Sequence, residues 1–132
     1  MKSIHLTQKA VVVNKDGKIL AVRRSKTAPT RPLHWDLPGG ELDWGEDPTE
    51  GIKREIKEET GLKVAQVAPF DIIARVYESG EYWISLGYKA VSRSIKVRLS
   101  YEHDQWKWGT AQEFLKLKIS AKIKRFVRKA RL

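Results

Sequence analysis

The segment from residue 40 to residue 62 limits the fold of this chain more than any other, because its residues are spaced for one short, capped helix. Asp47 can serve as the N-cap and Pro48 as the first helical residue, while Glu50 can complete the cap from the third helical position. Gly61 can end the helix in the left-handed conformation. The segment therefore predicts a helix over residues 48–60.

This helix would bring three glutamates together. Because successive residues turn by about 100° around a helix axis, Glu55, Glu58 and Glu59 share one narrow arc of its surface. Such carboxylates repel one another unless a cation compensates them, and Mg²⁺ takes oxygen ligands that it often shares with phosphate groups. Arg54 stands one turn before Glu58 and is expected to orient it through a charged hydrogen bond. The alternative is an ordinary exposed helix in which Lys and Glu alternate.

The same residues match a longer pattern, G-x5-E-x7-R-E-U-x-E-E-x-G-U, in which U is a bulky aliphatic residue. Its fixed positions are filled by Gly40, Glu46, Arg54, Glu55, Ile56, Glu58, Glu59, Gly61 and Leu62. On this complete match the chain resembles the Nudix hydrolases, and in particular the small MutT-like members of that family.

The resemblance implies an enzyme that hydrolyses a diphosphate bond in a nucleoside diphosphate joined to another group. The ligands that it implies for a divalent metal, Mg²⁺ or alternatively Mn²⁺, are Glu55, Glu58, Glu59 and the backbone carbonyl of Gly40. It also implies that Glu46 supports the site through Arg54, and that Gly61 supports it at the end of the helix. Within the motif, Glu58, Glu55 and Arg54 are the catalytic candidates, and the general base is one of the motif glutamates or a glutamate further along the chain.

Two candidate groups lie outside the motif. The resemblance implies a metal ligand or base in the loop before the strand expected at residues 106–108, where Glu102 is the first candidate and Asp104 the second. A solvated acidic loop is the alternative. The resemblance also implies an arginine that contacts substrate phosphate near the end of the second expected strand, where Arg24 and Arg23 stand.

With 132 residues, the chain is long enough for one domain with a real core and too short for two, so we expect residues 1–132 to form a single Nudix hydrolase domain. Strands are expected at residues 6–14, 18–23, 64–77, 82–92 and 106–108, with helices at 111–115 and 119–132 in addition to the motif helix. Hairpins and long crossovers are both needed, so the sheet should be mixed. The expected fold class is α/β, an α/β/α sandwich, which is also the fold that the resemblance implies.

The net charge of +10 is concentrated near the C-terminus, because residues 116–131 include eight Lys or Arg and no acid. Such a basic helix could bind RNA or attract a triphosphate, and a solvated helix face is the alternative. Membrane binding is not expected, since the core needs the apolar stripe of this helix. The absence of cysteine, of a signal peptide and of any apolar run as long as a membrane span predicts a cytoplasmic protein.

Three aromatic residues are candidates for contact with a nucleobase. Trp83, Tyr82 and Trp106 could form a wall on which a nucleobase stacks. A homodimer is common in the family that the chain resembles, but nothing in the sequence decides it.

Three functions remain in competition. The first is a nucleoside triphosphate pyrophosphohydrolase that releases a monophosphate and pyrophosphate. The second applies the same chemistry to an RNA 5′ end, ADP-ribose or a dinucleoside polyphosphate. The third is a noncatalytic module that binds a nucleotide or RNA, and the complete set of motif glutamates disfavours it.

Overall fold

Residues 3–130, which the computed structural model describes, contain seven strands that join into one sheet. The strands are β1 (Ile4–Val13), β2 (Ile19–Arg24), β3 (Trp35–Asp36), β4 (Gly39–Glu41), β5 (Val64–Val76), β6 (Tyr82–Ser92) and β7 (His103–Gly109). The main path has the order β3-β2-β1-β6-β5, while β4 pairs with β1 and β7 pairs with β2. β1 and β6 run parallel and the other pairs run antiparallel, so the predicted mixed sheet is confirmed.

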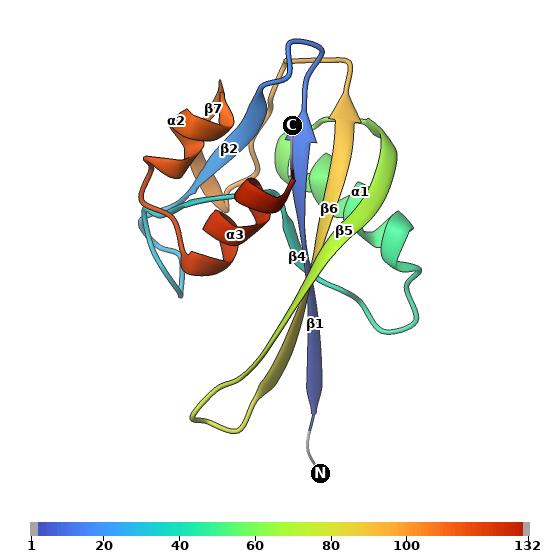
Figure 1. Ribbon diagram of the computed structural model, residues 1–132, viewed down its shortest axis with the longest axis vertical. Helices are drawn as coiled ribbons and strands as arrows, with labels where there is room; N and C mark the ends of the chain where they lie inside the picture. The colour runs from blue at the N-terminus through green and yellow to red at the C-terminus, as the bar shows by residue number, and fades with distance from the viewer. Residues whose placement is uncertain (1–2, 131–132) are drawn as a thin grey trace.

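Helices cover both faces of this sheet (Figure 1). They are α1 (Pro48–Thr60), α2 (Ala111–Leu115) and α3 (Ala121–Lys129) in the described part of the chain. The alternation of side chains along β1 supplies both cores, because Val12 packs in one cluster with Ile52 of α1, while Val11 packs in the other with Phe114 and Phe126. The α/β/α sandwich is therefore confirmed.

The motif helix α1 begins and ends where the sequence predicts. The Asp47 side chain accepts a hydrogen bond from the backbone N–H of Glu50, and Pro48 lies in the first turn. Gly61 has a left-handed φ of 74°, and its N–H donates to the carbonyl of Lys57. A complete capping box, with both reciprocal bonds, is formed at α2 by Thr110 and Glu113.

Several other elements differ from the expectation, each for its own reason. α3 begins at Ala121, after Ser120 caps it, instead of at residue 119, and the last two residues of the predicted helix lie outside the described part of the chain. β7 is longer than predicted because it pairs with β2 as far as Arg24. β3 and β4 were not predicted, since strands of two and three residues are too short to show an alternating pattern. Within residues 3–130, no helix has the length and apolar character needed to cross a membrane.

Phe126 fixes α3 on the sheet. Its buried ring lies so close to Gly87 of β6 that a Cβ there would stand 2.7 Å from it, and it meets Phe70 edge-to-face at 5.9 Å between ring centroids. We predict that Phe126→Ala lowers the free energy of unfolding by about 3–5 kcal/mol, because it leaves a cavity. Urea unfolding would measure this, with Arg128→Ala, an exposed change on the same helix, expected to stay within about 0.5 kcal/mol. Equal losses of unfolding free energy in the two variants would contradict this role of Phe126.

Candidate active site

Two glycines bring the backbone of β4 between β1 and α1. Gly39 has a φ of 146°, and a Cβ on it would overlap the carbonyl oxygen of Gln8 on β1. A Cβ on Gly40 would lie 2.9 Å from the Oε2 atom of Glu55 on α1. Backbone atoms exclude a side chain at Gly39, and the absence of a side chain at Gly40 lets the Glu55 carboxylate pack directly against the peptide backbone of β4.

Glu59 is the buried member of the motif glutamates. Its residue surface is 2% exposed, and its Oε1 atom accepts a hydrogen bond from the N–H of Gly39 at 3.2 Å. Burial raises the pKa of Glu59 well above its ordinary value, and the adjacent Glu55 carboxyl raises it further, while Lys9 partly opposes both effects. A cation bound between these carboxylates would relieve the burial and the repulsion, so the pair fits a metal site.

Glu58 is held in a different direction by Arg54. Its side chain is 58% exposed, and its Oε2 atom accepts a hydrogen bond from Arg54 at 3.0 Å. Arg54 also donates two hydrogen bonds to Glu46, at 2.6 and 3.0 Å, and one to Glu55 at 3.2 Å. The bonds from Arg54 lower the pKa of the Glu46 carboxyl. Both predicted contacts of Arg54 are present, and they tie the loop before α1 to the helix.

The three motif glutamates do not converge on one point. In residues 3–130, no three Asp, Glu, His or Cys side chains are grouped closely enough to hold a metal ion. Glu55 and Glu59 meet beside Gly40, whereas Glu58 faces Arg54. Because Arg54 donates to Glu55 as well as to Glu58, a site that uses all three carboxylates requires these side chains to move closer together.

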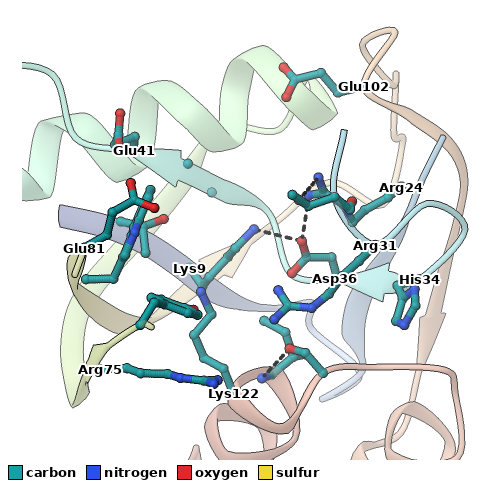
Figure 2. Close-up of a pocket in the computed structure, with 18 of the residues that line it drawn as sticks. Lys9, Arg24, Arg31, His34, Asp36, Glu41, Arg75, Glu81, Glu102 and Lys122 are labelled. Atoms are coloured by element: carbon teal, nitrogen blue, oxygen red, sulfur yellow. Dashed lines mark hydrogen bonds and ion pairs between the residues drawn. The ribbon is translucent and has the colours of Figure 1, made fainter. Parts of the chain in front are cut away.

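An open pocket of about 1120 Å³ begins at Gly39 and Gly40 and reaches the N-terminal end of α3. Figure 2 shows Glu102 near α1 at the top, Lys122 beside α3 at the bottom, and Lys9 and Asp36 between them. The charged residues that line it are Lys9, Arg24, Arg31, Asp36, Glu41, Arg75, Glu78, Glu81, Glu102 and Lys122. This volume is sufficient for a nucleotide and an additional group.

A buried ion pair network crosses the floor of this pocket. The Asp36 carboxylate accepts a hydrogen bond from Lys9 at 2.9 Å and lies 3.5 Å from Arg24. Arg24 also donates to the backbone carbonyl of Thr30 at 2.8 Å. Although burial opposes ionisation, the attraction and hydrogen bond of Lys9 hold the pKa of Asp36 below its ordinary value.

The candidates outside the motif separate into two groups. Arg24 and Glu102 line the pocket, and the loop of Glu102 is held to α1 because the N–H of Ser100 donates to the carbonyl of Glu59 at 3.2 Å. Arg23 is not among the pocket-lining residues, and its guanidinium donates to the two carboxylate oxygens of Asp104 at 2.8 and 3.0 Å. The alternation of β2 therefore gives the pocket Arg24 and places Arg23 with Asp104.

The predicted aromatic wall is only partly formed. Trp83 lines the pocket and stacks on His5, with 4.4 Å between the ring centroids. Tyr82 is not among the lining residues, because strand alternation directs it away from the face of Trp83. Trp106 is not among them either, since no residue of β7 lines the pocket. Trp35 lines the pocket and also packs against a core cluster.

Sequence reasoning missed the pocket residues that belong to no motif, notably Lys9, Asp36, Arg31, Arg75 and Lys122. They come from β1, β3, the loop before β3, β5 and α3. Asp36 could have been identified from the sequence, because it lies two residues before Pro38 and close to the two glycines at 39 and 40. The others had no local signal in a chain this rich in lysine and arginine.

Comparison with known proteins agrees with this geometry. A sequence model of the NUDIX domain matches residues 4–130. A MutT-like protein of Streptomyces ambofaciens is 46% identical over 104 residues, which are 78% of this chain and 62% of that relative, so the chain spans less than two thirds of its length. An RNA pyrophosphohydrolase of Acidiphilium cryptum is 28% identical over 116 residues, which cover 75% of this chain and 71% of the relative.

Two further similarities cover more of the chain. Nucleoside triphosphatase NudI of Escherichia coli O17:K52:H18 is 25% identical over 127 residues, which cover 89% of this chain and 90% of that protein. The crystal structure of a MutT protein from Methanosarcina mazei Go1 superposes with a TM-score of 0.82 at 27% identity, over 96% of this chain and 92% of that one.

The Asp36 network gives a prediction about stability. Because removing one charge from a buried pair leaves the other uncompensated, we expect Asp36→Asn to cost about 3–5 kcal/mol of unfolding free energy at neutral pH. The folded-state pKa of Asp36 is lowered, so its contribution is present above its ordinary pKa of 3.8 and is lost as the pH falls through the lower folded value.

The difference in unfolding free energy between wild type and Asp36→Asn should therefore narrow as the pH is lowered, and urea titrations over an acidic pH series would measure it. Asp104→Asn is the matched control, since it removes a partly exposed partner of Arg23 and should cost at most about 1 kcal/mol. If the difference in unfolding free energy between wild type and Asp36→Asn stays constant with pH, the lowered folded-state pKa of Asp36 is contradicted.

Proposed function

This chain belongs to the NUDIX domain family and is a Nudix hydrolase, and we propose that it cleaves a nucleoside triphosphate into a nucleoside monophosphate and pyrophosphate. The observation that carries this proposal is the continuity between the motif and the pocket. Gly39 and Gly40 contact the motif glutamates and also line a pocket large enough for a nucleotide. The relative named as a nucleoside triphosphatase, which this chain matches over most of both lengths, supports the same substrate class.

The proposed metal is Mg²⁺, with Mn²⁺ as the alternative. Its proposed ligands are the carboxylates of Glu55, Glu58 and Glu59 and the carbonyl of Gly40, whose oxygen atoms suit a hard cation. When bound, such a cation lowers the pKa of a water molecule and neutralises charge on phosphate oxygens. The residue pair that best supports this site is Glu55 with Glu59, since one of these two adjacent acids is buried and needs a positive partner.

The protein's own residues would then position the reactants. Arg54 restrains Glu58 and is itself held by Glu46, so the carboxylate of Glu58 has a defined starting orientation. As water attacks phosphorus and the bond to the pyrophosphate leaving group breaks, a carboxylate oxygen must accept the proton from that water. Glu58 and Glu102 are the proposed bases, because both are exposed. Glu102 lines the pocket, whereas Glu58 belongs to the motif helix and is not among the lining residues.

Arg24 is the proposed contact for substrate phosphate. It lines the pocket, and its bonds to Asp36 and to the carbonyl of Thr30 restrain its guanidinium before any ligand binds. Preorganisation of this kind reduces the entropy lost on binding. Arg23 is the weaker candidate, since Asp104 already occupies its guanidinium.

A second candidate keeps the chemistry and changes the substrate to the 5′ end of an RNA. It is favoured by the similarity to a protein named RNA pyrophosphohydrolase and by the basic residues of α3. Part of that charge is already compensated, because Arg125 and Lys129 both pair with Asp71. ADP-ribose and dinucleoside polyphosphates remain in the same group of alternatives, and a homodimer remains a prediction that a measurement of solution mass would test.

The experiment that tests the function is metal-dependent hydrolysis of a substrate panel, with the phosphate products resolved. The panel contains nucleoside triphosphates, ADP-ribose, a dinucleoside polyphosphate and a short triphosphorylated RNA. Pyrophosphate released from a triphosphate supports the first proposal, whereas turnover confined to the other members supports the second. Binding without turnover, with folded and metal-loaded protein, would favour a noncatalytic module.

We predict that Glu58→Gln lowers kcat by orders of magnitude in the same assay, because it removes a charge that the metal needs and no buried packing. The unfolding midpoint should stay near that of wild type. Glu50→Gln is the control, since Glu50 is an exposed glutamate in the first turn of the same helix. Retained metal-dependent turnover in Glu58→Gln would refute its place in the site.

We also predict that Arg24→Gln raises KM by about tenfold or more, because it removes a charged contact to phosphate, while Arg23→Gln leaves KM almost unchanged. Steady-state kinetics on the preferred substrate would measure both. The reverse order of effects would assign the phosphate contact to Arg23.

A further inference from the structure

Three cations of the pocket have no acidic partner. Arg31, Arg75 and Lys122 line the pocket from the loop between β2 and β3, from β5 and from α3. None of the three forms an ion pair with a carboxylate of residues 3–130, whereas Lys9 and Arg24 both pair with Asp36. Arg75 lies over the Tyr77 ring, 4.5 Å from its centroid, and Asp36 attracts Lys122, so the protein compensates the positive charge at the α3 end of the pocket only in part.

Of the three cations, Lys122 gives the clearest evidence of this positive charge. The residue is half-buried, and its Nζ atom donates to the hydroxyl of Ser85 at 3.3 Å. Burial and the nearby cations Lys9 and Arg31 together lower the pKa of Lys122 to about 8, although the Asp36 carboxylate partly opposes them. A half-buried ammonium group beside other cations is unfavourable, and a bound anion would reduce that penalty.

Arg31 reaches the pocket from a strained backbone. Its φ is 46°, in the left-handed region, where a residue with a Cβ is disfavoured by about 1–2 kcal/mol. Figure 2 shows its guanidinium pointing into the pocket near Asp36. Backbone strain of this kind clusters at active sites and ligand clamps, although Leu33 and Gln66 also have positive φ values and do not line the pocket.

The three cations lie away from the motif end of the pocket. In Figure 2, Arg75 and Lys122 lie beside α3, and Lys9 and Asp36 lie between Lys122 and Glu102. Glu81 lies between Arg75 and Glu41 on the other side of the view. A diphosphate at the motif glutamates would thus leave these cations for another part of the substrate. A neutral nucleobase could accept hydrogen bonds from them but could not compensate three positive charges, so an anionic group suits this end better.

We propose that Lys122, Arg31 and Arg75 form a second anion subsite, which binds a phosphate on the ribose of the substrate, separate from the diphosphate that is cleaved. The inference rests on the proposed function, because it takes the motif end of the pocket as the site of cleavage. The phosphate can belong to a free nucleotide that is phosphorylated on its 2′ or 3′ hydroxyl. It can equally be the first internucleotide phosphate at the 5′ end of an RNA.

The test is a binding measurement without turnover, so that it does not depend on the catalytic proposal. Dissociation constants for AMP, adenosine 3′,5′-bisphosphate, adenosine 2′,5′-bisphosphate and the dinucleotide pApA are measured by calorimetry, together with GMP. Wild type should bind at least one of the three ligands with the additional phosphate about tenfold tighter than AMP. Lys122→Met and Arg31→Gln should each reduce that preference several-fold. Lys124→Met, on the same helix but outside the pocket lining, should retain it.

The pattern of preference identifies the source of the phosphate. Tight binding of pApA supports an RNA end, whereas a preference for a bisphosphate alone supports a free nucleotide. Equal binding of AMP and all three ligands by wild type would overturn the inference, as would an unchanged preference in both pocket variants. It would also be overturned if Lys122→Met altered the choice between AMP and GMP and left the phosphate preference intact, because Lys122 would then contact the base. If no member of the substrate panel is hydrolysed, the proposed hydrolysis is refuted. The binding measurements would still test the anion subsite, because they do not require turnover.

Discussion

The close approach of β4 to both β1 and α1 is the constraint on which the rest of this structure depends. Gly39 has no room for a side chain because it faces the carbonyl of Gln8, and a side chain on Gly40 would displace the carboxylate of Glu55. This contact orders the backbone that separates the motif helix from the sheet. It also buries Glu59 against the N–H of Gly39, so the same two residues serve the fold and the candidate metal site.

Charge is arranged along the pocket in a way that follows from this geometry. Acidic side chains stand at the motif end, where a divalent cation would compensate them, and Asp36 neutralises part of the charge of Lys9 and Arg24 in the middle. Beyond them, Arg31, Arg75 and Lys122 leave the α3 end positive. A long substrate with phosphate groups would therefore meet a metal at one end and protein cations at the other.

The parts of the fold that sequence predicted well are those with strong local signals. The bounds of α1 follow from Asp47, Pro48 and Gly61, and the long strands follow from alternating or continuous apolar residues. The short strands β3 and β4 had no such signal, because their pairing is decided by distant partners on β2 and β1. The extension of β7 to His103 has the same cause.

For the site, the sequence by itself determined the motif chemistry: which glutamates share one helix, that Arg54 can reach Glu58 and Glu46, and which family the pattern resembles. These are consequences of spacing within a single element and the loop before it. Only the tertiary structure decided that Glu59 is buried against Gly39, that Arg24 enters the pocket while Arg23 pairs with Asp104, and that Lys122 and Arg31 line the same pocket. The physical reason is that these arrangements depend on which strand pairs with which and on the face that each side chain receives, and residues far apart in the sequence set both.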